Sequence, residues 1–239
     1  MKKIFIAGAS GAIGRRMLQI LKQHDYKVFG TTRSQQKADE LRADGIEPIV
    51  LDVFDASVVH EAMQRVRPDV VVNQLTDLPY GLDPALMPQA RVRNARVRKE
   101  GTKNLVDAAI AAGAQRLISQ SIAWVYAAGH EPHPESDPLE PAEGPPAITL
   151  EGVHALERLT LSSELSGVVL RYGMLYGPGT GQDNDDGLSI PVHVDAAAHA
   201  AVLAIARDAC GIYNIVADNP HVTNDKARRD LAWTPDFQT

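Results

Sequence analysis

The sequence predicts an α/β fold of the Rossmann type, in which a doubly wound parallel sheet carries helices on both faces. Short apolar runs alternate with amphipathic segments along the chain, which is typical of buried parallel strands joined by covering helices. Sequential units of this kind require right-handed crossovers, and these wind the sheet outward in both directions. The first apolar run also ends in a glycine-rich turn directly before a helical pattern.

The individual elements follow from hydrophobic periodicity. The expected strands are the apolar runs at residues 3–7, 26–30, 47–51, 69–73, 115–120, 167–171 and 211–216. The expected helices have apolar residues three or four positions apart, and the clearest span 12–23, 56–65, 87–112 and 195–206. With 239 residues, 44% of them hydrophobic, the chain is long enough to bury one full core.

The N-terminal turn has the layout of a dinucleotide site. A buried strand ends at Ala7, and the next helix begins inside the turn GASGAIG. Gly8 permits the tight turn, Gly11 lets the main chain approach a pyrophosphate, and Gly14 lets helix and strand pack closely. The turn therefore predicts that the chain binds a dinucleotide.

Two polar segments interrupt the alternation, at residues 129–147 and 177–191. Their proline, glycine and acidic residues prevent continuous helix or sheet. Both follow expected strand ends, where open α/β sheets bind ligands. We expect one domain over residues 1–239, in which 129–160 and 177–239 contribute a small C-terminal substrate-side lobe. The alternative is that the two loops are surface segments without a ligand.

Charge and composition argue against several partners. The formal net charge is −6 and most basic residues are scattered, which argues against nucleic acid. The clustered Arg91, Arg93, Arg96 and Arg98 fall in an expected helix, and we interpret them as a solvated face, with a dimer or phosphate contact as the alternative. The single cysteine, Cys210, cannot form an internal disulfide, and no apolar run has the length of a membrane span or the plan of a signal peptide. We expect a cytoplasmic protein with no membrane partner.

Further motifs resemble the extended short-chain dehydrogenase/reductase superfamily, in its NAD-dependent epimerase/dehydratase branch. GASGAIG looks like the family's GxxGxxG turn, and Asp52 looks like the acid that follows its third strand and faces the adenine. The other matching segments are KEGTKNLVDAA (99–109), LISQSIAWVYA (117–127), VVLRYGMLYGPG (168–179), VHVDAAAHA (192–200) and KARRDLAWTP (226–235). The resemblance spans nearly the whole chain and implies a nicotinamide cofactor and a small-molecule substrate. It leaves a homodimer open, through the long helices expected at 87–112 and 150–164.

The resemblance fails at the chemistry. The family moves a proton with a Tyr-x-x-x-Lys pair and a Ser or Thr on the fifth strand. Counted from Glu157, which looks like the family's helix glutamate, the Tyr and Lys positions fall on Thr149 and Val153, and the Ser or Thr position falls on Ile122. No shift of the alignment restores the pair, because none of the six tyrosines has a lysine four residues later. The sequence therefore predicts an atypical member that lacks the pair.

The end of the second strand favours NADP over NAD. An NAD-selective fold places Asp or Glu there, whereas this chain reads Thr31, Thr32 and Arg33. A guanidinium beside hydroxyls suits a 2′-phosphate, and NAD remains the alternative. The predicted cofactor-binding residues are Gly8, Ser10, Gly11, Ala12, Ile13, Gly14, Thr32, Arg33, Asp52, Val53, Leu75 and Thr76.

The catalytic residues stay unknown from the sequence. The candidate catalytic residues are Ser121, which is next to the expected Ser or Thr position, and Tyr126 and Tyr172, which could replace the tyrosine. For the two tyrosines a structural role is the alternative. His193 and Asp195 fit folding better, with Asp195 as a helix N-cap. No set of His and Cys residues has zinc spacing, so we expect no metal.

Three functions fit these observations. The first is an NADP-dependent oxidoreductase with an altered active site, which acts on a small carbonyl or related compound. The second is a non-catalytic NADP-binding redox sensor or partner-binding protein, which the missing pair favours. The third is a nucleotide-sugar epimerase or dehydratase, which the short segment after residue 179 disfavours.

Overall fold

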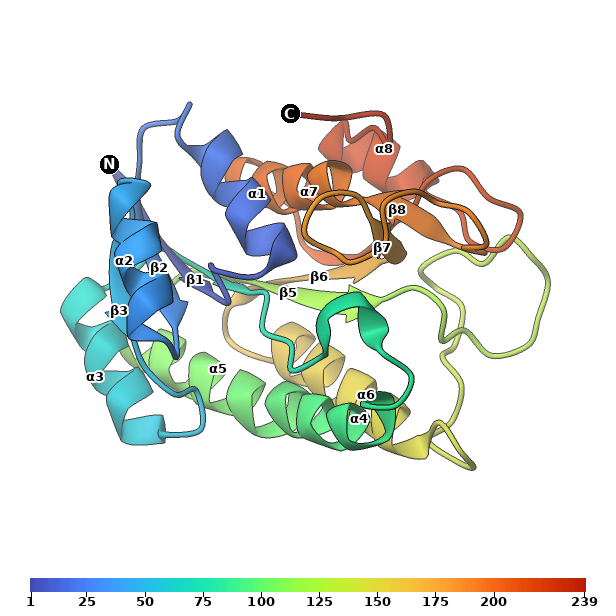
Figure 1. Cartoon of the computed structure of the whole chain (residues 1–239), viewed down its shortest axis with the longest axis horizontal. Helices are drawn as coiled ribbons and strands as arrows, with labels where there is room; N and C mark the ends of the chain where they lie inside the picture. The colour runs from blue at the N-terminus through green and yellow to red at the C-terminus, as the bar shows by residue number, and fades with distance from the viewer.

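The computed structural model describes residues 1–239 and confirms the expected parallel sheet (Figure 1). Its strands lie in the order β3-β2-β1-β4-β5-β6-β9, with every neighbouring pair parallel. The order reverses between β1 and β4, where sheets of this class open a ligand crevice. The strands are β1 (Lys2–Ala7), β2 (Tyr26–Thr32), β3 (Glu47–Val50), β4 (Val70–Asn73), β5 (Arg116–Ile122), β6 (Ser166–Tyr172) and β9 (Gly211–Ile215), and a separate parallel pair is formed by β7 (Met174–Tyr176) and β8 (Pro191–His193).

Helices cover both faces of the sheet (Figure 1). The upper layer in that view holds α1 (Ala12–Leu21), α7 (Val194–Ala206) and α8 (Asp225–Leu231). The lower layer holds α3 (Ala56–Val66), α4 (Met87–Arg96), α5 (Thr102–Ala111) and α6 (Ala147–Leu161), while α2 (Gln35–Ala43) lies beside β2 and β3. Side chains of β1 alternate between the two layers: Ile4 and Ile6 join the core under α1 and α7, and Phe5 and Ala7 join the core under α3 and α5.

The long helix expected at 87–112 is confirmed over 87–111, with one π-helical turn inside it. A π-helical turn, η2 (Val97–Gly101), separates α4 from α5. The helices α2 and α8, the strands β7 and β8 and a short 3₁₀ turn, η1 (Tyr80–Leu82), have no counterpart among the elements we expected. In α2 only Ala38 and Leu41 are buried, so its apolar pattern is too sparse to predict a helix.

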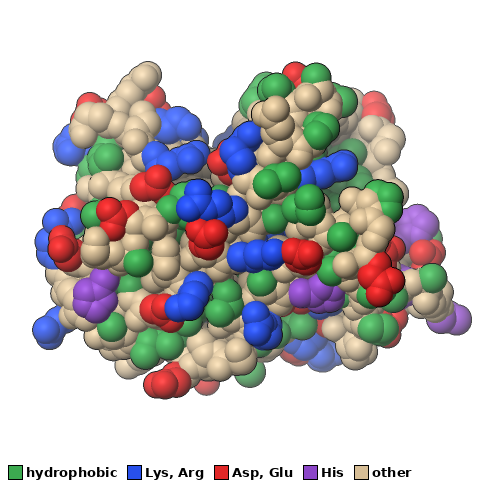
Figure 2. Space-filling view, turned by 90° about the horizontal axis from the view of Figure 1, so that it is seen from below, with side chains coloured by type: hydrophobic (Ala, Val, Ile, Leu, Met, Phe, Trp, Pro, Cys, Tyr) green, Lys and Arg blue, Asp and Glu red, His purple; other side chains and the backbone are tan.

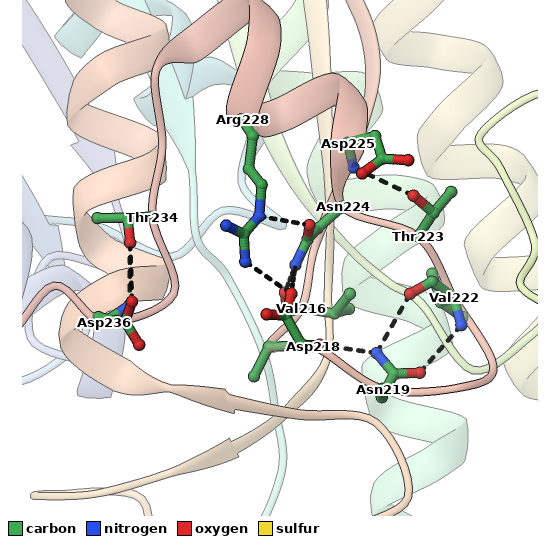
Figure 3. A network of polar contacts seen from close by, with 11 residues as sticks. Val216, Asp218, Asn219, Val222, Thr223, Asn224, Asp225, Arg228, Thr234 and Asp236 are labelled. Carbon is green, nitrogen blue, oxygen red and sulfur yellow. Dashed lines mark hydrogen bonds and ion pairs between the residues drawn. The ribbon is translucent and has the colours of Figure 1, made fainter.

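Polar contacts hold the C-terminal segment together (Figure 3). The Asn224 amide donates to the Asp218 carboxylate at 3.0 Å, and the Arg228 guanidinium donates to Asn224 Oδ1 at 2.7 Å and to Asp218 at 2.6 Å. Trp233 Nε1 then donates to the Ala196 carbonyl of α7 at 2.8 Å. The chain after β9 is therefore held beside α7.

The lower helical layer presents mixed charges (Figure 2). Arg91, Arg93 and Arg96 are exposed, as expected for a solvated face, but Arg98 is only 4% exposed, and for that residue the interpretation is wrong. Arg98 comes four residues after the buried Asn94, which places it on the inward side of the helix. None of the helices combines the length and the apolar character needed to span a membrane.

Candidate functional site

A cavity of about 1280 Å³ opens along the carboxyl edge of the sheet. Its wall takes residues from the ends of β1, β2, β5 and β6 and from the segments that follow β1 to β6. Ten of the predicted cofactor-binding residues lie on this wall: Gly8, Ser10, Gly11, Ala12, Thr32, Arg33, Asp52, Val53, Leu75 and Thr76. The fold thus brings together predicted residues that are up to 68 positions apart in the sequence.

Backbone carbonyl groups lie so close to Gly8 and Gly14 that neither position has room for a side chain. Gly8 has φ +87°, and a Cβ there would lie 2.6 Å from the carbonyl oxygen of Gln74. A Cβ on Gly14 would lie 2.4 Å from the carbonyl oxygen of Gly8, so Gly14 serves close packing. Gly14 and the buried Ile13 do not line the cavity, and we infer that they support the turn from behind.

The start of α1 is arranged for an anion. Gly11 is the N-cap, no side chain caps the helix, and the first turn contains no acidic residue. The amide groups at such an end have no intrahelical acceptor and carry the positive end of the helix dipole. Gly11 and Ala12 line the cavity, so this end fits a pyrophosphate there.

The end of β2 and the loop after β4 share a group of charges. The Arg33 side chain is 62% exposed and lies 3.8 Å from the Asp77 carboxylate, which also pairs with Arg93 at 3.4 Å. Thr32 Oγ1 accepts from the Ser34 amide at 3.2 Å, which fixes the turn that presents Arg33. Asp52 Oδ1 accepts from the Phe54 amide at 3.0 Å. Arg33 therefore has the reach and the exposure to meet a phosphate.

Of the two tyrosines that are catalytic candidates, Tyr172 lines the cavity and Tyr126 does not. Its side chain is 1% exposed, and its hydroxyl accepts from Gln74 Nε2 at 3.3 Å. Burial raises the pKa of the phenol far above its ordinary value, which makes it a poor proton donor. Gln74 Oε1 is buried and has no hydrogen-bond partner. Sequence reasoning gave no role to Gln74, because only its contact with Tyr172, 98 residues away, distinguishes it.

The other two candidates belong to a buried network behind the wall. Ser121 Oγ donates to Glu157 Oε1 at 2.7 Å, and Arg171 donates to both oxygens of Glu157 at 2.9 and 2.7 Å. The Tyr126 hydroxyl donates to Asn214 at 2.7 Å and accepts from Arg171 at 2.8 Å. Ser121 still reaches the cavity wall, whereas Tyr126 does not. Burial raises the pKa of Tyr126 as well, although the Arg171 charge opposes that rise.

The three positions that the resemblance assigned to catalysis lie near one another. Ile122 and Val153 are buried in one apolar cluster, together with Val125 and Leu150. Thr149 lies on the cavity wall one turn before Val153 in α6. The structure therefore juxtaposes β5 and α6 as the family pattern requires, with apolar side chains at two of the three positions.

The roles of His193 and Asp195 at the start of α7 differ from those expected from the sequence. His193 is the N-cap of α7, and its Nδ1 accepts from the Asp195 amide at 3.2 Å, so Asp195 as the N-cap is wrong. Asp195 instead pairs with Arg16 at 3.2 Å and accepts from the Thr239 amide at 3.0 Å. Its partners come from both ends of the chain, which spacing along the sequence could not indicate.

Comparisons with known proteins agree with this architecture. Residues 4–237 match the family model described as the NAD dependent epimerase/dehydratase family. A 3-diazoavenalumate denitrifying reductase from Streptomyces sp is 38% identical, over 98% of this chain and 80% of that protein. A 4-hydroxy-2-methyl-3-oxo-4-farnesyl-3,4-dihydroquinoline-1-oxide ketoreductase from Stigmatella aurantiaca is 27% identical, over 81% of this chain and 54% of that protein. The solved UDP-glucose 4-epimerase of Thermotoga maritima, in complex with UDP-glucose, superposes with a TM-score of 0.78 at 19% identity, over 99% of this chain and 94% of that one.

Proposed function

The chain belongs to the NAD dependent epimerase/dehydratase family, and we propose that it is a reductase that removes nitrogen from a small aromatic diazonium compound. Family membership makes it an NAD(P)-dependent enzyme of the oxidoreductase or epimerase/dehydratase type, as the sequence predicts. The Streptomyces relative, which matches nearly the whole chain, is named a denitrifying reductase.

The apolar side chains at Ile122 and Val153 carry this proposal. When bound, the nicotinamide supplies a hydride. Reduction of a ketone also requires a proton at the oxygen, for which the family uses its Tyr-x-x-x-Lys pair. A diazonium group, R–N₂⁺, needs the hydride alone: addition gives R–N=NH, which loses N₂ to leave R–H. Atoms and charge balance without a proton from the enzyme, so this reaction tolerates a site without the pair.

The walls of the cavity divide between cofactor and substrate in this proposal. The uncapped start of α1 holds the pyrophosphate, the Gly8 turn lets it approach, and Asp52 and Val53 lie beside the adenine. Arg33 holds a 2′-phosphate. The substrate occupies the part of the cavity lined by Thr149 and by the loop residues Gly179–Gln182.

Nitrogen release tests the reaction. We expect the purified protein to release about one N₂ per NADPH oxidised with ring-hydroxylated arenediazonium salts, above the rate without enzyme, and to leave matched aryl ketones unreduced. Tyr172→Phe should keep the rate within about threefold, since a lost general acid costs about 10²–10⁴-fold. Ketone reduction without N₂ release would contradict the proposed reaction, and a hundredfold loss in Tyr172→Phe would make that phenol the proton donor.

Cofactor preference tests the assignment of Arg33. Arg33→Ala should weaken NADPH binding about tenfold or more and leave NADH binding unchanged, because charge-assisted bonds to phosphate contribute about 1.5–3 kcal/mol. Fluorescence titration of both nucleotides measures the two dissociation constants. Arg42→Ala is the matched control, because Arg42 is an exposed arginine of α2 that pairs with Asp39 and lies off the cavity wall. Wild-type protein that prefers NADH would contradict the NADP assignment.

A further inference from the structure

Arg98 is a buried cation on the wall of the cavity. It lies in the π-helical turn η2 and is 4% exposed. Single π-helical turns inside helices occur frequently at functional sites. The side chain packs across α6: a Cβ on Gly152 would lie 3.4 Å from Arg98 Cδ. Its aliphatic part therefore packs against Gly152 of α6.

The Arg98 guanidinium has no partner of its own. It takes part in no hydrogen bond or ion pair, and the nearby carboxylate of Glu157 already binds Arg171 and Ser121. Burial lowers the pKa of Arg98 to about 10, and the charge of Glu157 only partly opposes this. The buried group thus contains two guanidinium ions and one carboxylate. Buried charges are normally paired, so the excess positive charge calls for an anion.

We propose that Arg98 binds a carboxylate group of the substrate. A guanidinium presents paired N–H donors that match the two oxygens of a carboxylate. The cavity is the open side of Arg98, because α6 packs against its aliphatic part and the Glu157 carboxylate is already paired with Arg171. This deepens the proposed function and rests on it for the statement that the site takes a small organic substrate.

Cofactor phosphates are poorer partners for this guanidinium. The pyrophosphate position at the start of α1 and the exposed Arg33 belong to β1 and β2, whereas Arg98 contacts α6, which packs against β5 and β6. Arg98 therefore lies on the side of the cavity next to α6. A substrate bound beside β5 and α6 lies in the part of the cavity that Arg98 lines.

Binding of simple aromatic acids to the NADP⁺-loaded protein tests the proposal. The probes are benzoate, cinnamate and 3-phenylpropionate, each beside its methyl ester, which keeps the shape and removes the charge. By calorimetry we expect at least one acid to bind about tenfold tighter than its ester, as for a charge-assisted hydrogen bond. In Arg98→Gln this ratio should fall to about one, while the dissociation constant for NADPH stays within about twofold.

Matched variants keep the test decisive. Arg96→Gln removes a cation from the same helix at an exposed position paired with Glu100, and it should keep the acid preference. If Arg98→Gln does not fold, Arg98→Lys replaces it, and the preference should drop at least threefold because a lysine lacks the planar fork. The proposal is overturned if no acid is preferred by the wild type, if the preference survives in the folded Arg98 variant, or if NADPH binding weakens as much as acid binding. These measurements need no turnover, so a protein that prefers acids but releases no N₂ would refute only the proposed reaction.

Discussion

Glu157→Gln is expected to lower the free energy of unfolding by about 3–5 kcal/mol, the loss typical when one partner of a buried ion pair is removed. Glu157 is 6% exposed, and its carboxylate accepts from Arg171 and Ser121. Arg171 is 3% exposed, so the variant leaves its guanidinium charged and without a counter-ion. The charge of Glu157 is also the one that acts on Arg98. Two buried cations would then have no carboxylate between them.

Glu151→Gln provides the control on the same helix. Glu151 pairs with Lys99 at the surface, where both side chains are more than 40% exposed. Exposed pairs of this kind contribute about 0–1 kcal/mol. Urea unfolding followed by circular dichroism measures both variants, with the slope of the transition as a check on two-state behaviour. Equal losses in the two variants would show that the Glu157 network does not hold β5, α6 and β6 together.

The central sheet was predictable because its signal is local. Apart from the edge strand β3, of which only Ile49 is buried, its strands are short apolar runs, and burial on both faces makes such runs stand out from the polar segments around them. The short pair β7 and β8 gave no such signal, since its strands are three residues each and most of their residues are only partly buried. The helix α2 exposes most of its surface at the edge of the sheet, so the hydrophobic pattern that predicts helices is nearly absent there.

The cofactor side and the substrate side of the site also differed in how far the sequence could predict them. The glycine turn can be recognised in the sequence because strand, turn and the start of the helix follow one another within fourteen residues. The importance of Arg98 depends on Gly152 and Glu157 of another helix, more than fifty residues later. In the sequence it stands among three arginines that proved to be exposed, and only packing separates it from them. Periodicity along one segment cannot predict burial that depends on packing against a distant segment.

Gly8→Ala is expected to weaken NADPH binding about a hundredfold, comparable to the loss that follows a displacement of about 1 Å in a binding element. A Cβ at Gly8 would lie 2.6 Å from the backbone oxygen of Gln74, closer than van der Waals contact allows. Backbone cannot rotate aside as a flexible side chain can, so the turn must move away from the end of β4. The start of α1 moves with it, because the Gly11 amide donates to the Gly8 carbonyl at 3.1 Å.

Gly45→Ala separates this displacement from simple backbone strain. Gly45 has φ +81°, close to the +87° of Gly8, but no atom lies within 4 Å of its would-be Cβ. Both variants carry the cost of a left-handed alanine, about 1–2 kcal/mol in unfolding free energy. Only Gly8→Ala adds the collision with Gln74, so only it should lose NADPH affinity in a fluorescence titration. If both variants bind NADPH like the wild type, the turn tolerates a side chain and the pyrophosphate does not depend on its close approach.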